Sequence, residues 1–125
     1  MMIVGLGIDI VDLARIEKCI SRFGLRFMQK ILGAEELAHI PGQPVNYVAG
    51  RFAVKEAAVK ALGTGFSQGI GPDQIEAISG PGGKPQLVLH GAALQQANSM
   101  GVTRYHVSIS HDRSSAVAVV ILEAS

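Results

Sequence analysis

Two carboxylates in apolar surroundings are the first candidates for chemistry in this chain. Asp9 is the one charged residue in the run IVGLGIDIV at positions 3–11, which predicts a buried strand that ends near Asp9. Glu56 projects within ~40° of Phe52, inside the apolar stripe of a helix expected over residues 45–62. Removing a carboxylate from water costs several kcal/mol unless a partner compensates it. Both side chains therefore need a cation or a hydrogen-bond donor.

A hard cation and a lysine are the candidate partners of these carboxylates. Oxygen ligands favour Mg²⁺, which takes one or two carboxylates together with substrate phosphates. Lys60 follows Glu56 by one helical turn, and an ordinary Glu-Lys pair of this spacing contributes only ~0.3 to 0.5 kcal/mol. Asp9 could also simply cap the helix that follows it. The spacing alone leaves a metal site, an ion pair and a helix cap open.

Further polar residues could meet a phosphorylated ligand. Gly63-Thr64-Gly65 would let backbone approach a phosphate, but the spacing is not G-x-G-x-x-G and no G-K-[ST] follows. Arg51 and Lys55 could bind phosphates or sit in water. Ser110-His111, at the end of an expected strand, could bind ligand or only form the turn. The pattern leaves these alternatives open.

Basic residues are concentrated between positions 12 and 30. Five basic side chains stand there against two acidic ones, and a continuous helix would align them along one side, although Gly24 can interrupt it. Such a run is usually a solvated face. Nucleic acid is a poor candidate partner because the net charge is only +1 and no aromatic residues interleave. An acidic protein helix is a better one. The basic residues are Arg15, Lys18, Arg22, Arg26 and Lys30.

The composition predicts one globular domain over residues 1–125, with 48% apolar and 17% charged residues. The single Cys19 excludes a disulfide within one chain, and no Cys or His pair has zinc-ligand spacing. The chain has no ~20-residue apolar stretch and no leader-like N-terminus, so we expect a cytoplasmic protein without a membrane partner.

The elements that must position these residues follow from the hydrophobic periodicity. Asp12 is typical of a helix N-cap, and apolar residues then recur at helical spacing in the early part of the chain, with Gly63 ending the long helix. Pro81-Gly82-Gly83-Lys84-Pro85 predicts the turn of a hairpin. The sequence therefore predicts an α+β fold with a mostly antiparallel sheet and a long central helix. We expect helices at 13–23, 27–32, 45–62 and 92–100, and strands at 3–11, 75–79, 86–90, 105–110 and 116–122.

Four segments resemble the holo-[acyl-carrier-protein] synthases, a family of 4'-phosphopantetheinyl transferases. They are GLGIDIVDLARIE from residue 5, GRFAVKEAAVKALGTG from residue 50, GKP from residue 83 and HVSISHDRSSAVAVVI from residue 106. The resemblance spans almost the whole chain. It implies the 4'-phosphopantetheinyl transferase fold and an Mg²⁺-dependent enzyme. The reaction would move 4'-phosphopantetheine from coenzyme A to a serine of apo-acyl carrier protein, releasing adenosine 3',5'-bisphosphate.

The resemblance also implies roles for particular residues. Asp9 and Glu56 would hold Mg²⁺ with the coenzyme A pyrophosphate, and Lys60 would contact a phosphate and steady the leaving group. Members of the family form homotrimers with the cofactor cleft between subunits. The residues that match coenzyme A contacts are Arg51, Gly63, Thr64, Gly65, Pro85, Ser110 and His111. Those that would dock the acidic carrier protein are Arg15, Arg22, Arg26 and Phe27.

Two other classes of function compete with this one. A non-catalytic module that binds coenzyme A or a nucleotide would explain the glycines and the basic residues, but it gives no role to paired carboxylates. A trimeric interaction protein would use the basic helix only to hold an acidic partner. Metal-dependent binding separates the first alternative from an enzyme, and the effect of Glu56→Gln separates the second.

Overall fold

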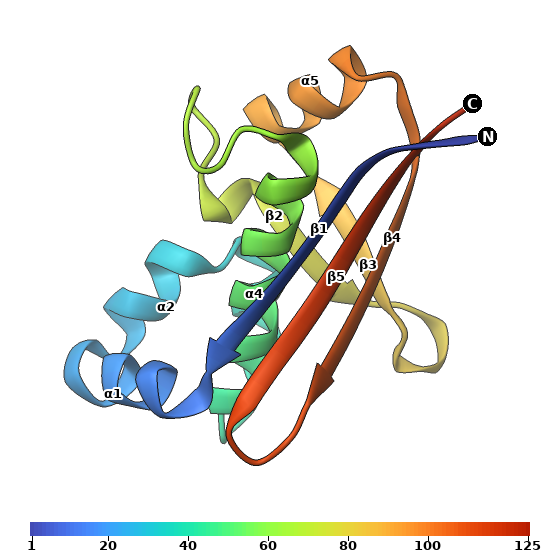
Figure 1. The fold of residues 1–125 in the computed structure, drawn as a ribbon. Helices are drawn as coiled ribbons and strands as arrows, with labels where there is room; N and C mark the ends of the chain where they lie inside the picture. Colours follow the sequence, from blue (N-terminus) through green and yellow to red (C-terminus); the bar gives the residue numbers. More distant parts are fainter.

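A long helix packed against an antiparallel sheet organises the chain, and the computed structural model describes all 125 residues (Figure 1). The predicted α+β fold is confirmed. Six shorter helical elements accompany the long helix and connect the strands. In chain order the elements are β1 (Met2–Asp12), α1 (Leu13–Phe23), α2 (Leu25–Ile31), α3 (Ala34–Ala38), α4 (Val45–Leu62), η1 (Pro72–Gln74), β2 (Ile75–Ser79), η2 (Pro81–Gly83), β3 (Pro85–Leu89), α5 (Gly91–Ser99), β4 (Val102–His111) and β5 (Ser115–Ala124).

The strands form two antiparallel sheets. The larger has the order β1-β5-β4, so the first and last strands of the chain pair and both termini lie at the same end (Figure 1). The smaller is the β2-β3 hairpin, as the turn residues predicted. In the larger sheet Asp9 lies opposite Ala118, which in turn lies opposite Ile109. This order makes β1 an edge strand and places Asp9 on it.

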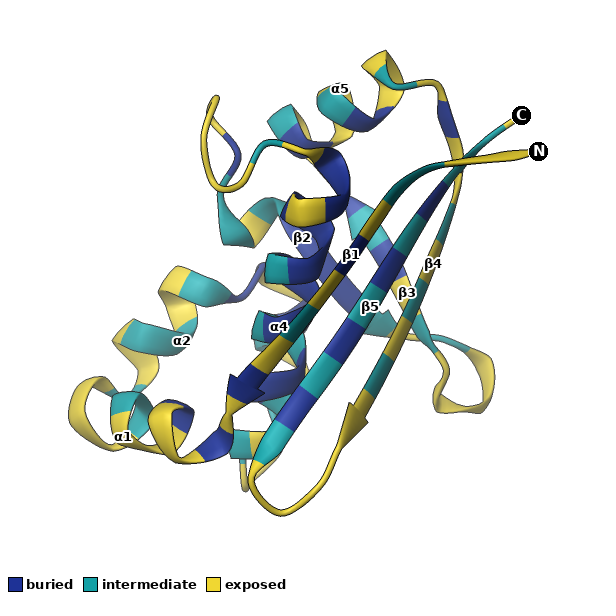
Figure 2. Cartoon of the chain, in the orientation of Figure 1, coloured by how far each residue is buried: buried dark blue, intermediate teal, exposed yellow.

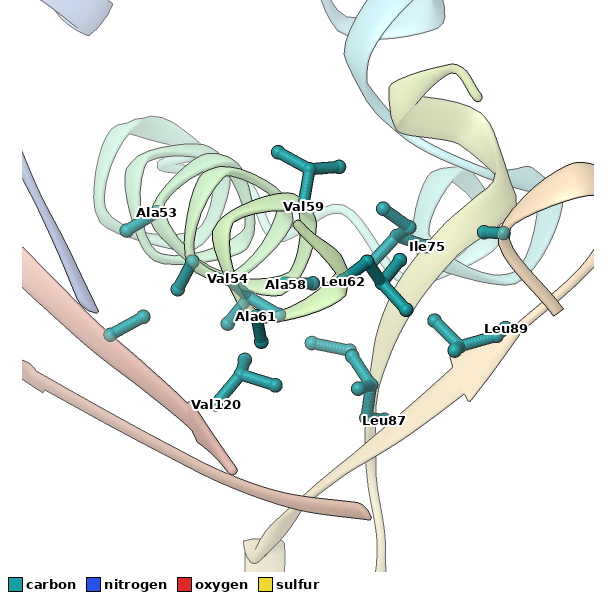
Figure 3. Packing of buried hydrophobic residues seen from close by; sticks show 14 of the residues in the cluster. Ala53, Val54, Ala58, Val59, Ala61, Leu62, Ile75, Leu87, Leu89 and Val120 are labelled. Carbon is teal, nitrogen blue, oxygen red and sulfur yellow. The ribbon is translucent and has the colours of Figure 1, made fainter. Parts of the chain in front are cut away.

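Helix α4 is buried on nearly all sides, and here the predicted apolar stripe was too narrow. The sheet covers one side of α4, whereas α1 and β2 pack against other sides. Figure 3 shows Val120 of β5 on one side of the α4 side chains and Leu87 and Leu89 of the hairpin nearby. Small side chains such as Ala53 and Ala57, both 0% exposed, let these elements approach closely. A single stripe cannot describe a helix that is enclosed by several elements.

Strand β1 differs from the expected buried strand. It continues past Asp9 to Asp12, and its outward side chains Ile3, Leu6, Ile8 and Ile10 are 61 to 67% exposed. Figure 2 shows the resulting alternation of buried and exposed positions. The reason is that α4 covers the inner face of the sheet, while nothing in this chain covers the outer face of β1. A continuous apolar run therefore became a strand with one exposed apolar face.

Local signals at the start of the helical region worked as predicted. Asp12 Oδ1 accepts a hydrogen bond of 3.2 Å from the Ala14 N–H, so Asp12 is the cap of α1. Asp9 therefore does not cap α1, which was one of the alternatives for it. Gly24, with φ of 58°, separates α1 from α2 and interrupts the line of basic residues. No helix combines the length and apolar character needed to cross a membrane.

Candidate active site

Asp9 and Glu56 line the same cleft, of about 380 Å³. The end of β1, the start of α1 and the middle of α4 enclose it, and Phe52 and Arg15 are among its lining residues. Asp9 points toward α4 because it shares the inner face of β1 with the buried residues Gly7 and Val11. Two carboxylates that lie far apart in the sequence thus line one cleft, as the family resemblance implied.

Lys60 pairs with Asp9 and not with Glu56. Its Nζ donates hydrogen bonds to Asp9 Oδ1 at 2.9 Å and to the carbonyl oxygen of Ile8 at 3.0 Å. The Glu-Lys pair along the helix, one of the alternatives for Glu56, does not form. The Lys60 side chain is 53% exposed, and exposed ion pairs contribute only ~0 to 1 kcal/mol. The ion pair with Asp9 therefore adds little to the stability of the fold. The half-exposed Lys60 side chain can also reach a ligand.

Glu56 has no ion-pair partner within the chain. Burial raises the pKa of its carboxyl group above the ordinary value, and the negative charge of Asp9 raises it further, while Lys60 and Arg15 act in the opposite direction. Burial and the charge of Asp9 thus both disfavour the ionised form of Glu56. A divalent cation in the cleft would favour the ionised form.

The residues of the cleft fit Mg²⁺ as a partly protein-bound ion. No group of three or more His, Cys, Asp or Glu side chains is arranged to hold a metal, so the protein offers the two carboxylates and an open cleft. Mg²⁺ is commonly bound in this way, with substrate phosphates and water completing the shell. The donor set therefore suits a metal that arrives with a phosphorylated substrate.

Lys55 takes neither of the roles that the sequence left open for it. Its Nζ is fully buried and donates to Glu36 Oε1 at 2.6 Å, to the Pro72 carbonyl at 3.0 Å and to the Ile75 carbonyl. Glu36 also accepts from the backbone N–H groups of Gly33 and Ala77, both at 2.9 Å. This buried network ties α4 to α3 and β2. The prediction of an exposed or phosphate-binding Lys55 was wrong because it assumed that α4 has a wide polar face.

The other predicted ligand residues on and after α4 lie apart from the carboxylate cleft. The Arg51 guanidinium stacks on the Tyr47 ring at 4.1 Å, in a separate cleft that Glu35 and His39 also line. Gly63 caps α4 in the left-handed conformation, as predicted, with φ of 78°. Thr64 Oγ1 donates to the Gly65 carbonyl at 2.9 Å.

Pro85, Ser110 and His111 lie on the far side of the sheet from β1. Pro85 lines a groove with Tyr105 and His106, and Ser110 and His111 are exposed at the end of β4, the opposite edge strand. Ser110 alternates with the inward Ile109 and so faces the outer side of the sheet, whereas Asp9 faces α4. One chain does not bring these residues into one cleft with Asp9.

A groove of about 730 Å³ runs along α1, where the basic docking surface was predicted. Arg15, Lys18 and Arg22 line it, and the Arg22 guanidinium lies over the Phe23 ring at 5.3 Å. Phe27 is partly buried against the core, whereas Phe23 is 54% exposed. Sequence reasoning missed Phe23, whose signal is its place in the last turn of a helix that ends at Gly24. It also missed that Arg15 lines both this groove and the carboxylate cleft.

Comparisons with known proteins agree with this architecture. Residues 5–120 match the family model "ACPS: 4'-phosphopantetheinyl transferase superfamily". A holo-[acyl-carrier-protein] synthase from Desulfovibrio desulfuricans is 72% identical over 98% of this chain and 99% of its own length. The crystal structure of the synthase from Neisseria meningitidis is similar with a TM-score of 0.89, at 39% identity over 98% of this chain and 99% of that one. The Helicobacter pylori synthase, solved in complex with coenzyme A, gives a TM-score of 0.83 at 34% identity, over 94% and 99% of the two chains.

These matches define the class of protein as a transferase of the 4'-phosphopantetheinyl transferase superfamily. Within that class, the chain belongs to the holo-[acyl-carrier-protein] synthases. The resemblance of the four sequence segments is thereby confirmed.

Proposed function

We propose that this enzyme transfers 4'-phosphopantetheine from coenzyme A to a serine of apo-acyl carrier protein, and that it requires Mg²⁺. The serine hydroxyl oxygen attacks the β-phosphorus of coenzyme A. The bond from that phosphorus to the bridging oxygen breaks, adenosine 3',5'-bisphosphate leaves, and the serine proton passes to a base. The observation that carries the proposal is that Asp9 and Glu56 line one cleft and that Lys60 forms an ion pair with Asp9.

Asp9 and Glu56 would hold the Mg²⁺ ion. When bound, the ion supplies positive charge that offsets the charge of the phosphates. Glu56 would take the serine proton, directly or through a water molecule, because its carboxylate lies in the cleft where the phosphates would bind. Lys60, half exposed beside Asp9, would turn its ammonium to a phosphate oxygen and stabilise the charge of the leaving group.

The remaining coenzyme A contacts would come from two copies of the chain. One copy would contact coenzyme A through Arg51 and through the backbone at Gly63, Thr64 and Gly65. Pro85, Ser110 and His111 would serve from a second copy, because Ser110 faces the outer side of the sheet, away from the carboxylate cleft of its own chain. Such sharing makes an oligomer necessary for activity.

The exposed apolar face of β1 supports a homotrimer as that oligomer. Ile3, Leu6, Ile8 and Ile10 lie beside the half-buried outward side chains of β5. Single-chain proteins rarely expose a continuous apolar surface of this kind. A second and a third copy of the chain would cover it and would bring Ser110 of one copy toward the cleft of another.

The groove on α1 would dock the carrier protein. Arg15 and Arg22 of the groove would supply positive charge for an acidic helix, and the exposed Phe23 would supply an apolar contact. Arg26 and Phe27 lie on α2, outside the lining of the groove, and would extend the docking surface beyond it. Arg15 lies at both the groove and the carboxylate cleft. A carrier helix seated there would present its serine to Glu56.

The proposal is tested by weighing a carrier protein before and after incubation. Purified enzyme, apo-acyl carrier protein, coenzyme A and MgCl₂ are combined, and the intact carrier mass is measured by mass spectrometry. A gain that matches phosphopantetheine, absent with EDTA and restored by excess Mg²⁺, is expected. Coenzyme A binding without any mass gain, for a folded enzyme and several carriers, would favour the non-catalytic module. The expected cytoplasmic location stays a prediction.

A further inference from the structure

Gly7 occupies the closest approach between β1 and α4. A Cβ atom added at Gly7 would lie 1.8 Å from the carbonyl oxygen of Ala57, 2.8 Å from the Ala57 carbonyl carbon and 2.9 Å from the Ala61 nitrogen. All three are backbone atoms, so no side-chain rotation can relieve the overlap. Gly7 pairs with Val120 in the regular antiparallel register, and its φ is not positive. Glycine is therefore needed here for space and not for an unusual backbone conformation.

The surface of α4 beneath β1 is built for the same close contact. Ala53, Ala57 and Ala61 recur every four residues and are 0 to 4% exposed, so they form a flat ridge. Gly5 repeats the contact one step earlier, since its Cβ would lie 2.3 Å from the Ala61 carbonyl oxygen. The distance between β1 and α4 is thus set by direct backbone contact, with no side chain between them.

The distance between β1 and α4 determines where Asp9 lies relative to Glu56. Asp9 follows Gly7 by two residues on the same face of β1, and the hydrogen bonds from Lys60 to Asp9 and to the Ile8 carbonyl join this part of β1 to α4. An alanine at position 7 would need a shift of about 1.2 to 1.6 Å, the difference between 1.8 Å and a contact of 3.0 to 3.4 Å. Metal ligands and reacting groups are held to within ~0.5 Å in working sites.

We propose that Gly7 is a positioning residue for the transfer reaction. Its contact with the Ala57 carbonyl holds β1 close enough to α4 for the Asp9 and Glu56 carboxylates to share one divalent cation. This inference rests on the proposed function. It assigns to the glycine before Asp9 a role in setting the distance between the two ligands, in addition to its place in the fold.

The test combines Gly7→Ala with Asp9→Glu. Gly7→Ala should lower the transfer rate by ~100-fold or more, as displacements of about 1 Å do. It should also weaken Mn²⁺ binding in the presence of coenzyme A, followed by electron paramagnetic resonance, by ~10-fold or more. In the Gly7→Ala background the longer Glu at position 9 should restore part of both losses, whereas in the otherwise unchanged enzyme Asp9→Glu should be harmful.

Two control variants separate positioning from general damage. Gly42→Ala makes the same change where nothing lies within 4 Å of the added atom and where φ is not positive. Val48→Ala lowers stability from a fully buried position of α4 that does not line the carboxylate cleft. Both control variants should bind Mn²⁺ with the affinity of the wild type. If Gly7→Ala does not fold, Gly5→Ala, with the smaller overlap, replaces it with the same expected restoration by Asp9→Glu.

The outcomes are distinct. An equal loss on Asp9→Glu in both backgrounds, or wild-type Mn²⁺ affinity in Gly7→Ala, would show that Gly7 serves only the fold. If the wild-type enzyme transfers no phosphopantetheine, the proposed function itself is wrong.

Discussion

Lys55 and Lys60 lie on the same helix, and the structure predicts opposite consequences when each is replaced by methionine. Lys55 is fully buried against Glu36 and two carbonyl oxygens. Removing one partner of a buried ion pair leaves the other charge uncompensated, at a cost of ~3 to 5 kcal/mol. Lys60 forms a half-exposed pair with Asp9, and such pairs contribute ~0 to 1 kcal/mol.

The stability of the two variants is measured by urea unfolding followed by circular dichroism. Lys55→Met should lose ~3 to 5 kcal/mol in the free energy of unfolding. Lys60→Met should stay within ~1 kcal/mol of the wild type. Adding Glu36→Gln to Lys55→Met should return part of the lost stability, because it removes the stranded charge.

The transfer rate should separate the variants in the reverse order. Lys60→Met should be slower by ~100-fold or more, as expected when a donor to the developing charge is removed. Lys55→Met, measured at a temperature where it is folded, should transfer at a rate closer to that of the wild type. Equal losses of stability in the two variants, or a Lys60→Met enzyme as fast as the wild type, would refute this division of roles.

Three further predictions concern the surfaces around the site. Replacing Arg22 and Arg26 together by glutamate should raise KM for the carrier by ~10-fold or more with little change in kcat, and added salt should act in the same direction in steady-state assays. Ile8→Lys should convert the oligomer into single chains of about 13.1 kDa in light scattering, and a wild-type protein that is itself a single chain would contradict the shared site. Hydrogen bonds from the backbone N–H groups of Ser114 and Ser115 hold the pKa of Asp112 below its ordinary 3.8. The ionised Asp112 therefore stabilises the fold above pH 3.8, and this effect is lost as the pH falls through the lower pKa of the folded state. Asp112→Ala should lower Tm slightly at neutral pH. It should not lower Tm at a pH below the folded-state pKa.

Much of the fold and the centre of the site could be predicted from local patterns. Gly24, Gly63 and Asp12 mark helix ends by backbone conformation and capping, which depend on neighbouring residues only. Asp9 and Glu56 stood out because a carboxylate in an apolar run requires compensation. These signals are local or concern one side chain at a time, so the sequence carries them directly.

Other features depend on which elements meet in space. The pairing of Lys60 with Asp9, instead of Glu56, follows from β1 lying on α4. The burial of Lys55 follows from α3 and β2 closing over a helix whose own periodicity gives no sign of it. The exposed face of β1 reflects a layer that one chain does not contain. No periodicity within a single segment encodes these contacts.

The most direct test of the carboxylate cleft as the reaction centre is the single-turnover rate of carrier modification by Glu56→Gln. Asp73→Asn, which removes one exposed carboxylate on η1, is the control. With folding verified, Glu56→Gln should slow phosphopantetheine transfer by ~100-fold or more, whereas Asp73→Asn should not. A Glu56→Gln enzyme that modifies the carrier at the wild-type rate would show that the carboxylate cleft is not the reaction centre.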